Sequence, residues 1–318
     1  MDRETHFPRT VPSCGIRRGV ALEKELAIAV QSPTPTLLTA VFGATGKQGG
    51  AVVDALLADG IRVRAVVRDP KSPAARALLA RGVEVVRADP ADREALTATL
   101  LHADAVFGMS TPAGPEGPAG ETARGIALAE AVAAAGAPRL VFSTVGGAER
   151  HTGIPHFESK RRIEEHIESL GLNATFVRPV FFMENLTQSV PFMGTSIENG
   201  TVVVRLPLPE SIPIQLVSVR DVGKIAASIM LGADVPGKAV EIAGDERTGR
   251  QIAHAIGAHL GLPSRYEAVP IEVLADDEDN AVMFQWYTRL PAHRADFALT
   301  RLIDPDVYDL PAWLAATT

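Results

Sequence analysis

Short apolar runs alternate with longer segments of helical periodicity from Thr36 onward. Apolar runs of four to six residues are typical of buried strands, and apolar residues every three or four positions are typical of helices. This pattern predicts strands at about 37–42, 62–67, 83–87, 105–109, 140–143 and 174–178, and helices at about 48–59, 72–81, 91–101, 121–135 and 156–170. Strands separated by helices of this length form parallel sheets with helices on both faces. We therefore expect an α/β fold with a doubly wound parallel sheet of the Rossmann type.

The regular alternation ends after residue 180. Residues 186–212 fit neither pattern well, and a helix is predicted from about 217 to 231. Residues 238–243 are then predicted to form a strand that returns to the main sheet, and residues 248–260 have the pattern of a helix.

The composition narrows the class of protein. The chain has 318 residues, 46% of them hydrophobic and 22% charged, which is typical of a globular domain. A net charge of −7 argues against nucleic-acid binding, and no apolar stretch is long enough to span a membrane. The single cysteine, Cys14, argues against a disulfide or a cysteine-rich metal site and favours a cytoplasmic protein. His254 and His259 are five residues apart, which does not favour a shared metal ion, so we expect no metal.

Residues 1–35 differ from the rest. Prolines bracket one short apolar patch, Leu22–Val30, and the early charges of Asp2 and Glu4 do not fit a secretory signal. We expect a poorly ordered extension, or the product of an upstream start codon.

A glycine-rich turn joins the first predicted strand to the first helix. Its glycines are Gly43, Gly46 and Gly49, a spacing that differs from the usual dinucleotide fingerprint. Such a turn also suits an ordinary tight connection. Its position between a strand and a helix N-terminus favours the alternative, a site where backbone N–H groups bind a pyrophosphate. The predicted cofactor contacts are Gly43, Ala44, Thr45, Gly46, Lys47, Gln48 and Gly49.

The second strand ends at Arg68, followed by Asp69 and Lys71. An acid at this position usually binds the ribose of NAD, whereas a base accommodates the 2′-phosphate of NADP. Arg68, supported by Lys71, therefore predicts NADP(H), with Asp69 starting a turn at Pro70. The alternative is a solvated surface arginine.

Two further strand ends are candidates for cofactor contacts. Asp89 either caps the next helix or accepts a hydrogen bond from the adenine amine, and both roles are compatible. Ser110 and Thr111 open a loop rich in proline and glycine, which is either a lid over the pyrophosphate or a mobile connection.

The fifth strand ends at Ser143, and His156 and Lys160 follow one helical turn apart. This order resembles the short-chain dehydrogenase/reductase superfamily, with its serine and its Tyr-x-x-x-Lys pair. The chain is most similar to the NmrA-like branch of atypical members. The resemblance extends over about residues 36–315, and its motifs are Val41–Gly49, His156–Lys160, Val177–Asn185, Met283–Tyr287 and Pro311–Leu314.

The resemblance implies roles for these residues. Lys160 would contact the nicotinamide ribose, and Ser143 would orient a carbonyl unless it is only a strand-end hydroxyl. His156 stands where the superfamily has its proton-donating tyrosine. It is therefore either a weak acid or a structural residue at the start of a helix. The segment from Pro179 through Phe182 to Asn185 would border the nicotinamide, although its apolar residues also suit a core.

The predicted organisation is an NADP(H)-binding domain at 36–180, completed by the strand at 238–243, with 181–237 and 244–318 forming a smaller substrate or partner region. The first functional hypothesis is a redox-state sensor that communicates with a regulatory protein, or an atypical reductase without the usual tyrosine. The alternative is an NADPH-dependent oxidoreductase that delivers hydride to a quinone, an enone or a similar small acceptor.

Overall fold

The computed structural model describes residues 37–89, 92–190 and 192–317. The expectation for residues 1–35 lies outside this part of the chain. Within it, no helix has both the length and the apolar character needed to cross a membrane.

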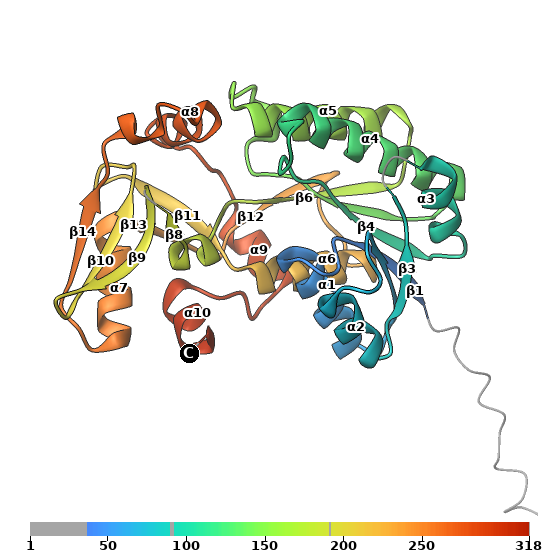
Figure 1. Ribbon diagram of the computed structural model, residues 1–318, viewed down its shortest axis with the longest axis horizontal. Coiled ribbons are helices and arrows are strands. Elements are labelled where there is room, and N and C mark those ends of the chain that lie inside the picture. Colours follow the sequence, from blue (N-terminus) through green and yellow to red (C-terminus); the bar gives the residue numbers. More distant parts are fainter. Residues whose placement is uncertain (1–36, 90–91, 191, 318) are drawn as a thin grey trace, which may run out of the picture. The chain divides into compact units, whose positions relative to one another are not determined.

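Seven parallel strands form the main sheet (Figure 1), in the order β12-β6-β5-β4-β1-β2-β3. Every neighbouring pair is parallel, which confirms the predicted fold class. The strand order reverses between β1 and β4, and ligands of such sheets bind at this switch point. The strands are β1 (Leu38–Phe42), β2 (Arg62–Val67), β3 (Glu84–Arg87), β4 (Ala105–Met109), β5 (Leu140–Ser143), β6 (Ala174–Pro179) and β12 (Ala239–Ile242).

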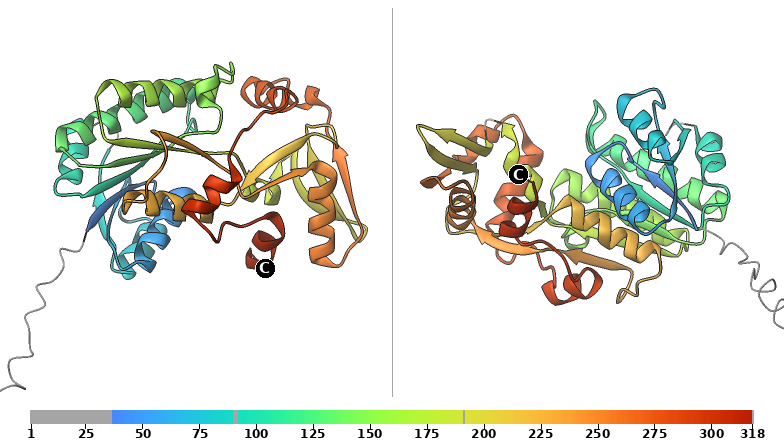
Figure 2. Two further views of the ribbon diagram at one scale, coloured as in Figure 1. Left: turned by 180° about the vertical axis from the view of Figure 1, so that it is seen from behind. Right: turned by 90° about the horizontal axis from the view of Figure 1, so that it is seen from below.

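Helices cover both faces of this sheet (Figures 1 and 2). On one face, α1 (Lys47–Ala58), α2 (Pro73–Ala80) and α6 (Val219–Met230) enclose one apolar core. On the other, α3 (Arg93–Leu100), α4 (Gly117–Ala135) and α5 (Pro155–Ser169) enclose a second.

Helix α6 lies within the range 181–237, which the sequence assigned to the smaller region. It packs instead on α1, so closely that a Cβ on Gly223 would lie 2.4 Å from the carbonyl carbon of Ala51. Val222 and Ile225 of α6 are fully buried in the core under the main sheet. The helix is therefore part of the dinucleotide-fold layer.

Two helix starts differ from the sequence prediction. Helix α4 begins at Gly117 rather than near residue 121, because Pro118 is in the first turn, where its fixed φ and missing N–H are tolerated. Helix α3 is capped by Asp92, whose side chain accepts a hydrogen bond from the backbone N–H of Ala95. Asp89 is therefore not the cap, and that prediction was wrong.

The remaining elements are two small sheets and a set of helices. One sheet contains β14-β10-β9-β8 and the other β13-β11-β7. Their strands are β7 (Phe181–Phe182), β8 (Ser189–Val190), β9 (Met193–Glu198), β10 (Thr201–Leu206), β11 (Pro213–Val217), β13 (Asp245–Thr248) and β14 (Ser264–Ala268). The helices are η1 (Ala148–Arg150), η2 (Met183–Thr187), α7 (Gly249–Leu260), η3 (Ile271–Leu274), α8 (Glu278–Tyr287), α9 (Phe297–Ile303) and α10 (Leu310–Thr317).

An aromatic cluster in the core of this region contains a buried histidine, His293. Its ring lies 5.2 Å from that of Trp286 and 5.4 Å from that of Tyr287. Neither ring nitrogen of His293 has a hydrogen-bond partner among the described residues. Burial, with a smaller contribution from the charge of Arg150, lowers the pKa of His293 to about 3. The imidazole is therefore neutral in the folded protein above this pH.

This histidine should make the fold sensitive to acid. As pH falls below about 6.5, His293 takes up a proton in the unfolded chain but stays neutral in the folded chain. The free energy of unfolding therefore falls by about 1.4 kcal/mol per pH unit. We expect a His293→Phe variant to lose about 2 kcal/mol less stability than the wild type between pH 7 and pH 5. Urea unfolding at the two pH values measures this. The exposed His259 provides a control, because His259→Gln should leave the pH dependence nearly unchanged. An unchanged pH dependence in His293→Phe would contradict the assignment.

Candidate functional site

The glycine-rich turn between β1 and α1 is built without room for side chains. Gly43 has a φ of +67°, and a Cβ there would lie 2.8 Å from the sulfur of Met109. A Cβ on Gly49 would lie 2.3 Å from the carbonyl oxygen of Gly43. The N–H of Gly46 donates to the same carbonyl at 2.8 Å, which closes the turn. Gly43 is therefore favoured by its positive φ, and Gly49 is required by its close contact with the backbone of Gly43.

Helix α1 starts directly after this turn and has no side-chain cap. Its N-cap residue is Gly46, which has no side chain to accept a hydrogen bond from the first turn. The first N–H groups of a helix have no partner within the helix, and they favour an anion. Since the turn also exposes its backbone, this end of α1 can accept a phosphate group.

A pocket of about 640 Å³ opens over the turn. Its volume is in the range of small-molecule and cofactor sites. Five of the predicted contacts in the turn line it: Gly43, Thr45, Gly46, Lys47 and Gln48. The ends of β2 and β4 and the segment after β6 add four more: Arg68, Ser110, Thr111 and Phe182. Residues predicted from four separate segments are thus brought to one pocket.

Arg68 is exposed at the carboxyl end of β2 and lines the pocket. In the described part of the chain it makes no hydrogen bond or ion pair, whereas Arg64 of the same strand is bound to Glu84 at 2.8 Å. An unpaired guanidinium at a pocket wall can bind a phosphate with two parallel hydrogen bonds.

The other predicted cofactor contacts do not line this pocket. Ala44 and Gly49 are buried under the turn, and Lys71 and Asp89 are exposed at neighbouring strand ends. Pro179 is buried and its carbonyl accepts a hydrogen bond from the N–H of Gly146 at 2.8 Å. The Asn185 side chain accepts one from Gln188 at 2.8 Å. Their roles as cofactor contacts stay predictions.

Ser143, at the end of β5, is 2% exposed and its hydroxyl donates to Oε1 of Gln48 at 2.7 Å. Gln48 lines the pocket, so this bond joins the end of β5 to the glycine-rich turn. The hydroxyl proton of Ser143 is therefore used in a hydrogen bond to the side chain of a pocket residue.

His156 begins α5 and contacts a residue 123 positions away in sequence. Its Nδ1 lies 2.7 Å from Oδ2 of Asp279, and its backbone N–H donates to Oδ1 of the same carboxylate at 3.0 Å. Burial raises the pKa of Asp279, but the hydrogen bond and charge of His156 outweigh this and the net shift is downward. The ionised carboxylate can only accept, so the proton of this contact is on Nδ1 of His156. Nδ1 of His156 is therefore occupied by Asp279.

The acidic run at 276–279 lies at the start of α8. Asp277 is the N-cap residue and Asp279 is the partner of His156. Asp279 therefore has a contact that the local sequence did not indicate.

Lys160 lies one turn along α5 and is directed to different partners. Its ammonium donates to Oε1 of Glu121 at 2.7 Å and to the carbonyl oxygen of Ser110 at 3.1 Å. His156 and Lys160 are spaced to share a helix face, but they bind different helices. His156 contacts Asp279 of α8, and Lys160 contacts Glu121 of α4.

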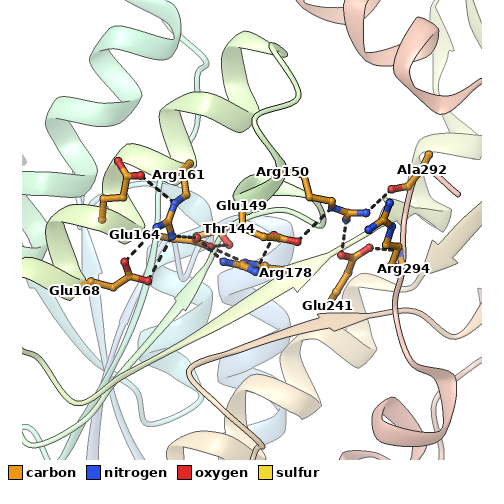
Figure 3. Close-up of polar contacts among 11 residues, drawn as sticks. Thr144, Glu149, Arg150, Arg161, Glu164, Glu168, Arg178, Glu241, Ala292 and Arg294 are labelled. Carbon is orange, nitrogen blue, oxygen red and sulfur yellow. Dashed lines mark hydrogen bonds and ion pairs between the residues drawn. The ribbon is translucent and has the colours of Figure 1, made fainter. Parts of the chain in front are cut away.

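An ionic network supports the loop that follows β5 (Figure 3). Glu164 is completely buried, accepts from the hydroxyl of Thr144 at 2.7 Å and binds the guanidinium of Arg178 at 2.7 Å. Further along, Arg150 binds Glu241 at 2.6 Å. These contacts link α5, β5, β6, η1 and β12, so they hold the carboxyl ends of adjacent strands in place.

Sequence reasoning missed Glu121 and Arg124, both on α4. Glu121 holds Lys160, and Arg124 lines the pocket and donates to the carbonyl oxygen of Thr111 at 3.0 Å. Acidic and basic residues are common on exposed helix faces, so nothing in the local pattern marked these two. No group of three or more His, Cys, Asp or Glu side chains among the described residues could hold a metal ion.

The sequence profile described as the NmrA-like family matches residues 35–303. The chain belongs to the NmrA-like family. This confirms the resemblance drawn from the motifs, and it covers both the dinucleotide fold and most of the C-terminal region.

Among curated relatives of this NmrA-like chain is the NAD(P)H azoreductase of Xenophilus azovorans. It is 30% identical over 233 residues, which are 73% of this chain and 77% of the relative. The (4-alkanoyl-5-oxo-2,5-dihydrofuran-3-yl)methyl phosphate reductase of Streptomyces griseus is 32% identical over 234 residues, with the same coverage of 73% and 77%. Both names describe reductases.

A solved structure of NmrA, a negative transcriptional regulator, in complex with NADP has the same fold. The TM-score is 0.75 at 21% identity, covering 89% of this chain and 95% of that chain. At 21% identity, this match shows that the two proteins share a fold.

Proposed function

We propose that this NmrA-like protein binds NADP(H) and reduces a quinone, an enone or a similar small acceptor. The observation that carries the proposal is the pocket at the switch point of the sheet, with the uncapped start of α1 at one wall and the unpaired Arg68 at another. The names of the two curated relatives described above, both reductases, support it.

The residues of the pocket fit the dinucleotide. Gly43 and Gly46 line the pocket and have no side chains, so the turn that contains them would hold the pyrophosphate with its backbone. Arg68 would bind the 2′-phosphate, and Phe182 would form an apolar wall. When bound, the dinucleotide supplies the hydride, and the protein supplies orientation and the exclusion of water.

The contact of His156 with Asp279 bears on the class of acceptor. His156 is not among the residues that line the pocket, and its Nδ1–H is bound to Asp279 of α8. The residue that stands where the superfamily has a proton-donating tyrosine is thus held by α8 and is not part of the pocket wall. Quinones and enones suit such a site, because electron withdrawal by the conjugated carbonyl favours hydride addition with little help from an acid.

A second candidate is a redox sensor that binds NADP(H) and signals its state to a regulatory protein. The same contact of His156 with Asp279 favours it, since a sensor needs the pocket but no proton donor. The fold shared with a transcriptional regulator is compatible with this role.

NADPH oxidation with a panel of quinones and enones separates the two candidates. The reductase predicts turnover that survives His156→Phe and falls with Lys160→Ala. Tight NADPH binding without turnover on any acceptor would contradict the reductase and favour the sensor.

The preference for the phosphorylated cofactor should depend on Arg68. A hydrogen-bonded ion pair of this kind contributes about 1.5–3 kcal/mol, so Arg68→Gln should weaken NADPH binding about 10- to 100-fold. NADH binding should change little, because NADH lacks the phosphate. Arg62→Gln, at the exposed opposite end of the same strand, is the matched control. Equal effects of Arg68→Gln on both cofactors, measured by calorimetry, would contradict the assignment.

A further inference from the structure

The ammonium of Lys160 occupies a nearly enclosed position beside the pocket. The Lys160 side chain is 12% exposed, and two of its donors are used, one on Oε1 of Glu121 and one on the carbonyl oxygen of Ser110. An ammonium has three N–H donors. Among the described residues the third has no partner.

The carboxylate that binds it, Glu121 on α4, is completely buried. Its Oε1 also lies 3.4 Å from the hydroxyl of Ser110, and its Oε2 accepts from the hydroxyl of Ser159 at 2.5 Å. Burying a carboxylate is unfavourable unless it is paired and hydrogen-bonded. Glu121 meets both conditions, through Lys160 and the two serines.

The position of this network ties it to the cofactor pocket. Ser110 is the first residue after β4 and lines the pocket, so the ammonium is bound to a residue of the pocket wall. A lysine side chain is long and flexible, and a lysine without a fixed partner samples many positions. The contact with Glu121 restricts the ammonium to one of them.

We propose that Glu121 is a positioning residue for cofactor binding and acts through Lys160. It fixes the Lys160 ammonium against the carbonyl of Ser110, so that the free N–H is available to a ligand of the pocket. The inference rests on the proposed function, in which Lys160 contacts the bound dinucleotide. Neither a local motif nor the family resemblance marked Glu121.

A double-mutant cycle tests this inference. The dissociation constant of NADPH is measured by calorimetry for the wild type, Glu121→Gln, Lys160→Met and the double variant. We expect each single substitution to weaken binding about tenfold, and the double variant to bind no more weakly than Lys160→Met alone, because interacting residues are not additive. Glu130→Gln, on the same helix but bound to Arg93 at 3.0 Å, is the control and should bind like the wild type.

Thermal unfolding of each variant is the control that shows whether the variant is folded. A single substitution leaves one buried charge unpaired, whereas the double variant removes both, so the double variant keeps the cycle interpretable if a single variant unfolds early. In that case the double variant is predicted to bind NADPH about tenfold more weakly than the wild type, and wild-type affinity would overturn the inference.

Three results distinguish the outcomes. NADPH binding by Glu121→Gln within twofold of the wild type would overturn the role of Glu121. The same would follow if Glu121→Gln weakened binding equally in the presence and absence of Lys160, since that pattern indicates an independent effect on the fold. An absence of NADPH binding by the wild type would instead contradict the proposed function, before any variant is compared.

Discussion

A Gly49→Ala variant should bind NADPH about 100-fold more weakly than the wild type, because misplacing binding groups by about 1 Å can have effects of this size. The added Cβ would lie 2.3 Å from the carbonyl oxygen of Gly43 and 2.4 Å from its carbonyl carbon. These are backbone atoms, so the turn itself must shift. The same carbonyl closes the turn by accepting from Gly46, so the shift disturbs the wall of the pocket.

The adjacent Gly50 provides a matched control. A Cβ at Gly50 would meet only the carbonyl oxygen of Ala44, at 3.5 Å, which is an ordinary contact. Alanine is favoured over glycine within a helix by about 1 kcal/mol, so Gly50→Ala should keep its affinity and unfold at a slightly higher temperature. Equal NADPH dissociation constants for Gly49→Ala and Gly50→Ala, measured by calorimetry, would contradict the proposed role of the glycine-rich turn in binding the cofactor.

The second large effect concerns stability. Replacing Glu164 with glutamine should destabilise the fold by about 3 kcal/mol, since removing one partner of a buried ion pair leaves the other charge uncompensated. Glu164 is completely buried, and it binds both Arg178 and Arg161 (Figure 3). The melting temperature should fall by about 6–12 °C for a protein of this size. Differential scanning calorimetry measures both quantities.

Glu168→Gln is the control for this substitution. Glu168 also binds Arg161, at 3.2 Å, but its side chain is 40% exposed. Exposed ion pairs contribute at most about 1 kcal/mol, so the melting temperature of this variant should stay close to that of the wild type. A Glu164→Gln variant as stable as Glu168→Gln would show that the network carries no stability.

The sequence predicted the central strands of the main sheet because these strands are buried on both faces, as in β5, which has the apolar run Leu140, Val141 and Phe142. The small sheets were not predicted. β7 has only two residues, Phe181 and Phe182, and it pairs with β11, which lies more than 30 positions away. No local period signals a strand of this length, since its pairing is decided by tertiary contacts.

For the candidate site, the backbone-based predictions were more informative than the side-chain ones. Gly43 and Gly46 follow from the local requirement of a strand–turn–helix connection, and both line the pocket. The partners of His156 and Lys160 come from α8 and α4. Helical spacing placed the two residues on one face, but it could not show that distant acids, Asp279 and Glu121, would bind them separately.

We propose above that the pocket over the glycine-rich turn binds a dinucleotide whose extra phosphate contacts Arg68. Calorimetric titration of the full chain with NADPH and with NADH, at the same salt concentration, tests this proposal. We expect saturable heat with NADPH and binding at least about tenfold weaker with NADH, the smallest ratio expected from one charged hydrogen-bonded contact. No heat with NADPH, or tighter binding of NADH, would contradict it.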